Sequence, residues 1–310
     1  MNSSQQNKIY GHDKILLDLI ELEKKNKLPN KILLSGKKSI GKSTLAYHLI
    51  NFIFSKNEEY KYDTANFTIN PNNKSHVLVN NNTHPNLFRL FLKDDKKNIE
   101  VSDIRNLINF TNLSSLSNQK KIVLIDDIEH LSINSVNALL KVIEEPNDNT
   151  YFILINNLDK KIKDTLKSRC IEFKLSINKN AIRDIINDLY PEVGYDSISN
   201  DFIHFSNSLT ILIDFLTICI NEKIDFNKVS IEVFLKYIFD NNLYKKKDFK
   251  KVDFKNFIEI FFLRKVNNQP NEKLFKLYSY FNKKYEKFNK YNLDMESYFL
   301  EFNSKLLHEK

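Results

Sequence analysis

The segment Ile32-Leu33-Leu34-Ser35-Gly36-Lys37-Lys38-Ser39-Ile40-Gly41-Lys42-Ser43-Thr44 decides the fold. An apolar run that indicates a buried strand stops at a glycine, and an apolar pattern with helical spacing follows at once. The glycine-containing part has the form G-x-x-x-x-G-K-S, which is typical of a phosphate-binding loop. The sequence therefore predicts a strand, a phosphate loop and a helix in this order.

Each residue type in this loop suits phosphate binding. Gly36 and Gly41 let the backbone turn its N–H groups toward phosphate oxygens. Lys42 brings a cation to the β- and γ-phosphates, Ser43 offers a hydroxyl to Mg²⁺, and Thr44 lies in the first turn of a helix whose positive end points to the same place. The chain has only 4 glycines in 310 residues, and two of them hold these positions. We interpret the loop as a phosphate site; the alternative is an ordinary turn beside a solvated lysine.

Length and composition predict two or three domains without a membrane span. The chain has 310 residues, of which 42% are apolar, with 24 Phe and 14 Tyr to fill cores. No apolar run reaches the roughly 18 residues that cross a bilayer, and the first residues are polar, so we expect a cytoplasmic protein. Cys170 and Cys219 lie far apart, which argues against a disulfide framework and predicts two buried small side chains.

The net charge of +8 is weak evidence for nucleic-acid binding. The 47 basic residues include only five arginines, at positions 89, 105, 169, 183 and 264, and lysine and asparagine are abundant throughout. This pattern indicates a compositional bias of the whole chain. Whether lysine clusters such as Lys245-Lys246-Lys247 and Lys250-Lys251 contact DNA stays open.

Hydrophobic periodicity predicts an α/β domain up to about residue 175 and helices after it. The expected elements are a lead-in helix through Ile15–Leu22, a strand within 84–91, a helix from Val101, strands at 121–125 and 151–155, and a helix from Ile133 that Pro146 ends. Strands that alternate with helices predict right-handed crossovers and a parallel sheet. The polar residues 56–82 predict either a long surface loop or an extra subdomain.

Candidate site residues follow the two buried strands. Asp126 ends the strand at 121–125, where a carboxylate can hold Mg²⁺ through water together with Ser43. Asp127 stands where an ATPase of this layout usually has a glutamate to activate water, and we interpret Glu129 as a surface charge. Asn156 ends the next strand and is either a polar sensor of the γ-phosphate or a loop cap.

Arg169, in Ser168-Arg169-Cys170, is the second strong signal. An isolated arginine in a lysine-rich chain suggests a role that needs a planar guanidinium. Two functions fit: a structural ion pair, or an arginine finger that reaches the γ-phosphate of another subunit. In the context of the phosphate loop, we favour the second.

The motifs together resemble the AAA+ clamp-loader subunits of the bacterial replicative polymerase, DNA polymerase III, and among these most of all the delta-prime type. The matching pieces span residues 9–175 and are Gly11-His12, the phosphate loop, His84-Pro85-Asn86-Leu87, Val101-Ser102-Asp103-Ile104-Arg105, Val123-Leu124-Ile125-Asp126-Asp127, Asn137-Ala138-Leu139-Leu140-Lys141-Val142-Ile143-Glu144-Glu145-Pro146 and Thr165-Leu166-Lys167-Ser168-Arg169-Cys170.

The resemblance implies an AAA+ P-loop core at 1–175, an all-helical lid at 176–220 and an all-helical collar at 221–310. It implies a non-polymerising subunit of a DNA-directed DNA polymerase holoenzyme, in a five-subunit hetero-oligomeric ring that loads the sliding clamp on primed DNA. Partners would be gamma/tau-type and delta-type subunits and the clamp, with ATP and Mg²⁺ as possible cofactors.

Three departures from the family pattern indicate a subunit that turns ATP over weakly or not at all. Motor subunits of the gamma/tau type carry four zinc-binding cysteines after the phosphate-loop helix, and 56–82 has no cysteine, so we expect no zinc site. The Asp-Glu pair is replaced by Asp126-Asp127, and the expected lid arginine is not found around Ser206-Asn207-Ser208-Leu209. The alternatives are an ATP-hydrolysing gamma/tau-type motor, another DNA-acting AAA+ enzyme and, more remotely, an unrelated phosphate-loop kinase.

Overall fold

The computed structural model describes residues 4, 6–93, 96–113, 119–147, 149–158, 160–205, 208–249, 252–291 and 293–307. The chain forms two compact units, Met1–Ile182 and Arg183–Lys310. Ser206 and Asn207, near which we expected a lid arginine, and the cluster Lys250-Lys251 lie outside the described residues.

The first unit is built on a five-stranded sheet in which every pairing is parallel. The strand order is β2-β3-β4-β1-β5, so the first strand lies between the fourth and the fifth. The strands are β1 (Lys31–Ser35), β2 (Leu87–Leu90), β3 (Lys121–Ile125), β4 (Thr150–Asn156) and β5 (Ile171–Lys174). The predicted parallel sheet is confirmed, and its β3 is buried along its whole length, as its continuous apolar run indicated.

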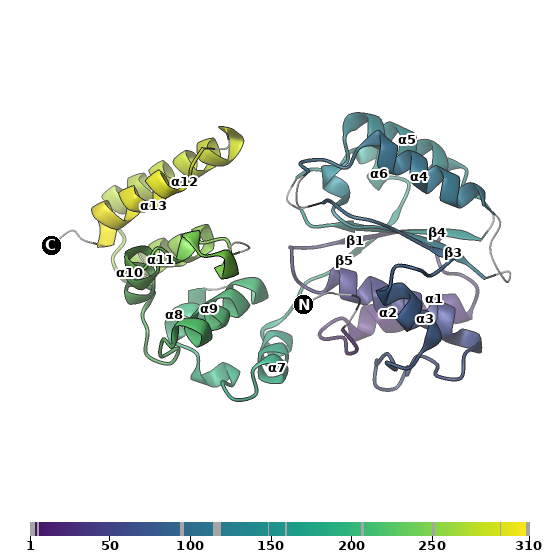
Figure 1. The fold of residues 1–310 in the computed structure, drawn as a ribbon, viewed down its shortest axis with the longest axis horizontal. Coiled ribbons are helices and arrows are strands. Elements are labelled where there is room, and N and C mark those ends of the chain that lie inside the picture. Colours follow the sequence, from purple (N-terminus) through teal and green to yellow (C-terminus); the bar gives the residue numbers. More distant parts are fainter. Residues whose placement is uncertain are drawn as a thin grey trace. The chain divides into compact units, whose positions relative to one another are not determined.

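Helices cover both faces of this sheet (Figure 1). One face carries α1 (Asp13–Lys24), α2 (Lys42–Phe54) and α3 (Lys74–Asn80), and the other carries α4 (Val101–Asn112), α5 (Ile133–Glu144) and α6 (Asp164–Lys167). Successive side chains of a strand point to opposite faces. Accordingly, Leu34 packs into the core beneath α1 and α2, while Leu33 packs into the core beneath α4 and α5.

Residues 56–82 contain the helix α3 and pack against the first unit, with Tyr62, Ile69 and Val79 buried in its core, so the segment is more than a surface loop. A 3-10 turn (Ser55–Asn57) and α3 are joined by Glu58, whose carboxylate accepts hydrogen bonds from the hydroxyl of Ser75 (2.5 Å) and from Asn73 Nδ2 (2.6 Å). Asn73 also caps α3 and accepts a hydrogen bond from Asn51 of α2 at 2.9 Å. These bonds fasten the segment 56–82 to α2. Apolar periodicity could not predict them because the contacts are polar.

The second unit is helical in every element that the described residues define. It contains α8 (Asn200–Phe205), α9 (Leu209–Glu222), α10 (Ile231–Asp240), α11 (Lys255–Asn268), α12 (Glu272–Tyr291) and α13 (Glu296–Phe302), with 3-10 turns at Tyr195–Ser197, Leu243–Lys245 and Lys247–Phe249 and a π-helical turn at Asn303–Leu307; α7 (Lys179–Leu189) runs across the boundary between the units. None of the helices that the described residues form is both long and apolar enough to cross a membrane.

Aromatic side chains make the core of this unit. Phe202 stacks on Phe215 with ring centroids 3.6 Å apart, and Phe234 and Phe257 pack edge-on against them. All four rings are buried, which confirms that the aromatic stripes are core packing. Helices on both sides of residue 220 thus share one cluster, and the separation of a lid from a collar stays a prediction.

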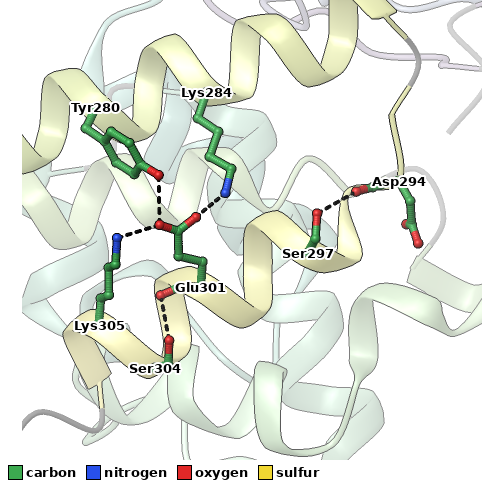
Figure 2. A network of polar contacts seen from close by, with 7 residues as sticks. All are labelled: Tyr280, Lys284, Asp294, Ser297, Glu301, Ser304 and Lys305. Atoms are coloured by element: carbon green, nitrogen blue, oxygen red, sulfur yellow. Dashed lines mark hydrogen bonds and ion pairs between the residues drawn. The ribbon is translucent and has the colours of Figure 1, made fainter.

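A second group of contacts holds α12 to α13. Glu301 accepts hydrogen bonds from Tyr280 (2.8 Å) and Lys305 (2.5 Å), and it pairs with Lys284 (Figure 2). Glu301 lies near the end of α13, whereas Tyr280 and Lys284 belong to α12. The network therefore joins the last two helices through a carboxylate with three donors.

The two cysteines differ in burial. Cys219 is 1% exposed inside α9, as predicted, whereas Cys170 is only partly buried. Burial raises the pKa of the Cys219 thiol to about 12 and that of Cys170 to about 11, so both are neutral thiols at physiological pH.

Candidate functional site

The phosphate loop connects β1 to α2 in the conformation that its glycines predict. Gly41 has φ +91°, a backbone conformation that favours glycine, and it is the N-cap of α2. A Cβ atom at Gly36 would lie 2.6 Å from the carbonyl oxygen of Leu175 and 2.6 Å from Ile40 Cδ1. The loop therefore needs Gly41 for its backbone angle and Gly36 for its close packing.

Lys42 lies inside this loop. Its side chain is nearly buried, at 3% exposure, and its ammonium donates to the carbonyl oxygens of Gly36 (2.8 Å) and Lys37 (2.5 Å). His12 Nε2 donates to the carbonyl oxygen of Ile40 at 2.6 Å, which ties the residue before α1 to the same loop. The cation is therefore held where a loop of this kind receives phosphate oxygens.

Ser43 and Asp126 meet although 83 positions separate them in the sequence. Ser43 Oγ donates to Asp126 Oδ2 at 2.6 Å. Burial raises the pKa of Asp126, and the hydrogen bond from Ser43 partly opposes this effect. The structure thus brings together the hydroxyl and the carboxylate that we expected at a magnesium site, and Thr44 follows them in the first turn of α2.

The backbone of Asp127 is left-handed rather than extended. It adopts φ +58° and ψ +44°, and its Oδ1 accepts a hydrogen bond from Asn157 Nδ2 at 2.7 Å. Glu129 lies in the following 3-10 turn and is 8% exposed, with its Oε1 accepting from the backbone N–H of Asn157 at 3.0 Å. Our interpretation of Glu129 as a surface charge is therefore wrong, because the alternation of β3 ends before this residue.

Asn156 caps the loop that follows β4. It is 4% exposed, and its Oδ1 accepts from the backbone N–H of Leu158 at 3.0 Å. Its Nδ2 lies 3.5 Å from the hydroxyl of Ser35, at the end of the neighbouring strand β1. The cap is observed, and the sensor function stays a prediction.

Arg169 makes its contacts away from this group. Its Nη2 lies 2.5 Å from Glu144 Oε1, and its Nη1 donates to the carbonyl oxygen of Thr165 at 2.8 Å. The Arg169 side chain is 36% exposed. The ion pair that we considered for this residue is present, and the arginine-finger function stays a prediction.

A cavity of about 330 Å³ opens beside Ser43 and Asp126. Its wall includes Tyr47 of α2 and Arg89 of β2, and Arg89 Nη1 donates to the Tyr47 hydroxyl at 3.1 Å. The sequence motifs did not indicate a function for either of these two residues. The scarcity of arginine, which drew attention to Arg169, applies equally to Arg89 and was the available signal.

The fold and this site define a class of protein. A parallel sheet of order β2-β3-β4-β1-β5, a phosphate loop after β1 and an aspartate after β3 are the features of an AAA+ type α/β domain, here followed by a helical unit. A family model described as "DNA polymerase III, delta subunit" matches residues 11–179, more than half of the chain. The chain belongs to this family.

The curated relatives include subunits named delta-prime and others named gamma or tau. DNA polymerase III subunit delta' of Buchnera aphidicola subsp. Baizongia pistaciae is 38% identical over 154 residues, which is 47% of this chain and 44% of the relative. The subunit of the same name from Pseudomonas aeruginosa is 34% identical over 99 residues, 32% of this chain and 30% of the relative. These matches confirm the resemblance to the delta-prime type, and the aligned part spans less than half of each relative.

Among solved structures, a DNA polymerase III gamma subunit-related protein from Thermotoga maritima aligns with a TM-score of 0.39. The two chains are 19% identical in the aligned part, which covers 83% of this chain and 78% of the other.

Proposed function

We propose that this chain is a delta-prime-like subunit of the DNA polymerase III clamp loader. In this proposal it is one member of a five-subunit AAA+ ring that loads the sliding clamp on primed DNA in the cytoplasm. Its partners are gamma/tau-type and delta-type subunits, the clamp and, through the assembled complex, primed DNA. The family membership and the delta-prime relatives support this assignment.

The observation that carries the proposal is the state of Asp127. Asp127 lies where an active ATPase has its water-activating carboxylate. Its side chain is shorter than that of glutamate, and its Oδ1 accepts a hydrogen bond from Asn157. A general base must reach the proton that it accepts. A carboxylate engaged in this way supports a subunit that turns over ATP weakly or not at all.

The phosphate loop nonetheless fits a nucleotide. Gly36 and Gly41 shape a cradle that a Cβ would fill or strain, and Lys42 lies within it. Ser43 and Asp126 present one hydroxyl and one carboxylate oxygen 2.6 Å apart, a donor set that suits Mg²⁺. When bound, Mg²⁺ supplies positive charge to the phosphates. These residues would hold ATP with Mg²⁺, whereas zinc has no part in the proposal.

The contribution of Arg169 to catalysis lies in the neighbouring subunit. A guanidinium supplied by one subunit can stabilise the charge that develops on the γ-phosphate of the next. Arg169 is partly exposed and held at one edge by a single carboxylate, Glu144. Such a pair between partly exposed groups is weak, so the arginine can exchange this partner for a phosphate.

One observation favours the alternative of an ATP-hydrolysing motor, namely that the Ser43–Asp126 pair and Lys42 form an intact phosphate site. Steady-state ATPase of the purified chain separates the two functions. We expect little turnover and little change on Lys42→Ala; vigorous turnover that Lys42→Ala abolishes would establish the motor instead.

The trans function of Arg169 is tested in the reconstituted ring. Arg169→Ala should abolish ATP hydrolysis by the ring while the subunits still assemble, as measured by size-exclusion chromatography. Arg183→Ala is the matched control because Arg183 also pairs with one exposed carboxylate, Asp196, at 2.5 Å. Wild-type ATPase in the Arg169→Ala ring would overturn this part of the proposal.

A further inference from the structure

Arg89 is a cation at the wall of the cavity beside the phosphate loop. It belongs to β2, which pairs with β3, the strand that Asp126 follows, and it is only partly exposed. The cavity of about 330 Å³ is lined by Arg89 and Tyr47 together with Ser43 and Asp126. A second cavity of about 330 Å³, on the side of α3, also has Arg89 in its wall. Arg89 therefore lines both cavities.

The other arginines show what is unusual about Arg89. Arg169, Arg183 and Arg264 each form an ion pair with a carboxylate, and Arg105 is exposed on α4. Within the described part of the chain, Arg89 forms no ion pair with a carboxylate. It donates a hydrogen bond to the Tyr47 hydroxyl, and its guanidinium carbon lies 5.8 Å from the centroid of the Tyr47 ring. A partly buried positive charge that pairs with none of the described carboxylates favours an anionic ligand.

Tyr47 holds this cation in place. It lies one helical turn after Ser43 on α2, so that both side chains face the same cavity. Burial raises the pKa of the Tyr47 hydroxyl. The positive charge of Arg89 lowers this pKa, and the negative charge of Asp126 raises it, so the hydroxyl feels both charged groups. The hydroxyl is therefore neutral and fixes one edge of the guanidinium.

We propose that Arg89 and Tyr47 form a subsite for a phosphate group in the cavity beside the phosphate loop. The planar guanidinium binds two phosphate oxygens at once, which a lysine cannot do. Asn82, at the rim of both cavities, offers an amide to the same ligand. The phosphate group comes either from the end of a nucleotide in the loop or from free inorganic phosphate.

This subsite does not depend on the proposed place of the chain in a clamp loader. It uses a cation on β2 that the phosphate-loop motif does not include. The test is an equilibrium titration of the purified full chain with inorganic phosphate in the presence of Mg²⁺, followed by ³¹P NMR, at constant ionic strength. It is repeated with ADP bound, because ADP fills the phosphate loop itself, and on a Lys42→Ala background, which removes the loop cation.

Arg89→Met should weaken phosphate binding about tenfold in all three settings, as expected for the loss of one charge-assisted hydrogen-bonding group. Arg105→Met, which removes an exposed arginine, should leave binding within about twofold of wild type. Tyr47→Phe should weaken binding less than Arg89→Met, because it removes only the group that orients the guanidinium. If Arg89→Met does not fold, Arg89→Lys replaces it, with a smaller loss expected.

Two further titrations identify the source of the phosphate group. If Arg89→Met weakens a non-hydrolysable ATP analogue but not ADP, the subsite takes the terminal phosphate of the nucleotide. If it weakens only inorganic phosphate, the ligand is the free ion. Equal affinities of wild type, Arg89→Met and Tyr47→Phe for every ligand would overturn the proposal, and so would an equal loss in Arg105→Met. If the chain binds phosphate through Arg89 but binds no nucleotide, the proposed nucleotide site at the phosphate loop is wrong, whereas the Arg89 subsite stands.

Discussion

Arg169 Nη2 lies 2.5 Å from Glu144 Oε1, so the arginine of the S-R-C motif pairs with the first glutamate of the E-E-P motif. Glu144 is the last residue of α5, and Arg169 follows α6 and precedes β5. The hydrogen bond from Nη1 to the carbonyl oxygen of Thr165 holds the same guanidinium in a second direction. Two motifs that were separate in the sequence thus define one surface feature.

The first prediction concerns the stability of this pair. Arg169→Ala should lower the free energy of unfolding by less than about 1 kcal/mol, because both side chains are more than a third exposed and water screens their attraction. Urea unfolding followed by circular dichroism measures the change, with Arg183→Ala as the control. A cost above about 3 kcal/mol would show that the arginine is a structural residue, and any loss of ring ATPase would then follow from misfolding.

The second prediction concerns Gly36. Gly36→Ala should destabilise the first unit by about 1 to 3 kcal/mol, because the new methyl group would overlap the backbone oxygen of Leu175 and the side chain of Ile40. Hydrogen exchange followed by mass spectrometry should show faster exchange in β1 and β5. Gly194→Ala is the control. Gly194 has φ +69°, and a Cβ added there would meet no atom within 4 Å, so only about 1 kcal/mol of backbone strain is expected, without any effect on β1.

The elements of this protein that depend on a local pattern of residues could be predicted from its sequence. Apolar runs and helical spacing predicted β1, β3, β4 and the helices α1, α4 and α5. The phosphate-loop motif and the position of Asp126 after a buried strand predicted that Ser43 and Asp126 would meet, because parallel strands present their carboxyl ends at one edge of the sheet.

The residues that were missed depend on contacts between distant segments. Glu129 is buried because a turn after β3 directs it to the backbone of Asn157, which follows β4. Arg89 meets Tyr47 because β2 lies beside β3, and no periodicity encodes that neighbour. The segment 56–82 is held by hydrogen bonds to α2 and by the buried side chains of Tyr62, Ile69 and Val79, for which the sequence has no repeating signal.

The third prediction concerns pH and the histidines of the first unit. Burial lowers the pKa of His84 and of His48 to about 4 from the ordinary value of 6.5, and Glu58 partly opposes the effect at His84. The folded state therefore keeps both rings neutral while the unfolded chain binds protons. Stability should fall as the pH falls from about 6.5 to about 4, because the unfolded state takes up more protons in this window.

The measurement is urea unfolding at several pH values between 7 and 4. His84→Gln should flatten the pH dependence, because it removes one ring whose pKa is lowered by burial, although it also loses the stacking of His84 on Phe54. His204→Gln, at an exposed position on α8, is the control. A His84→Gln slope equal to that of wild type would show that His84 does not contribute to the pH dependence.

The fourth prediction concerns the network around Glu301 (Figure 2). Burial alone would raise the pKa of this carboxylate, but the hydrogen bonds from Lys284, Lys305 and Tyr280 outweigh it and lower the pKa to about 2 from 4.5. A depressed carboxylate pKa stabilises the fold above the unfolded value, so the contribution is complete above about pH 4.5 and is lost as the pH falls toward 2.

Glu301→Gln should therefore destabilise the second unit by about 1 to 2 kcal/mol at pH 7, since it removes a carboxylate with three donors, two of them charged. The difference from wild type should shrink as the pH is lowered from 4.5, because protonation then removes the same charge from the wild-type chain. Glu272→Gln is the matched control, since Glu272 pairs with Lys276 on the exposed surface of α12. If the gap between wild type and Glu301→Gln stayed constant down to pH 3, packing of the side chain rather than its charge would hold α12 to α13.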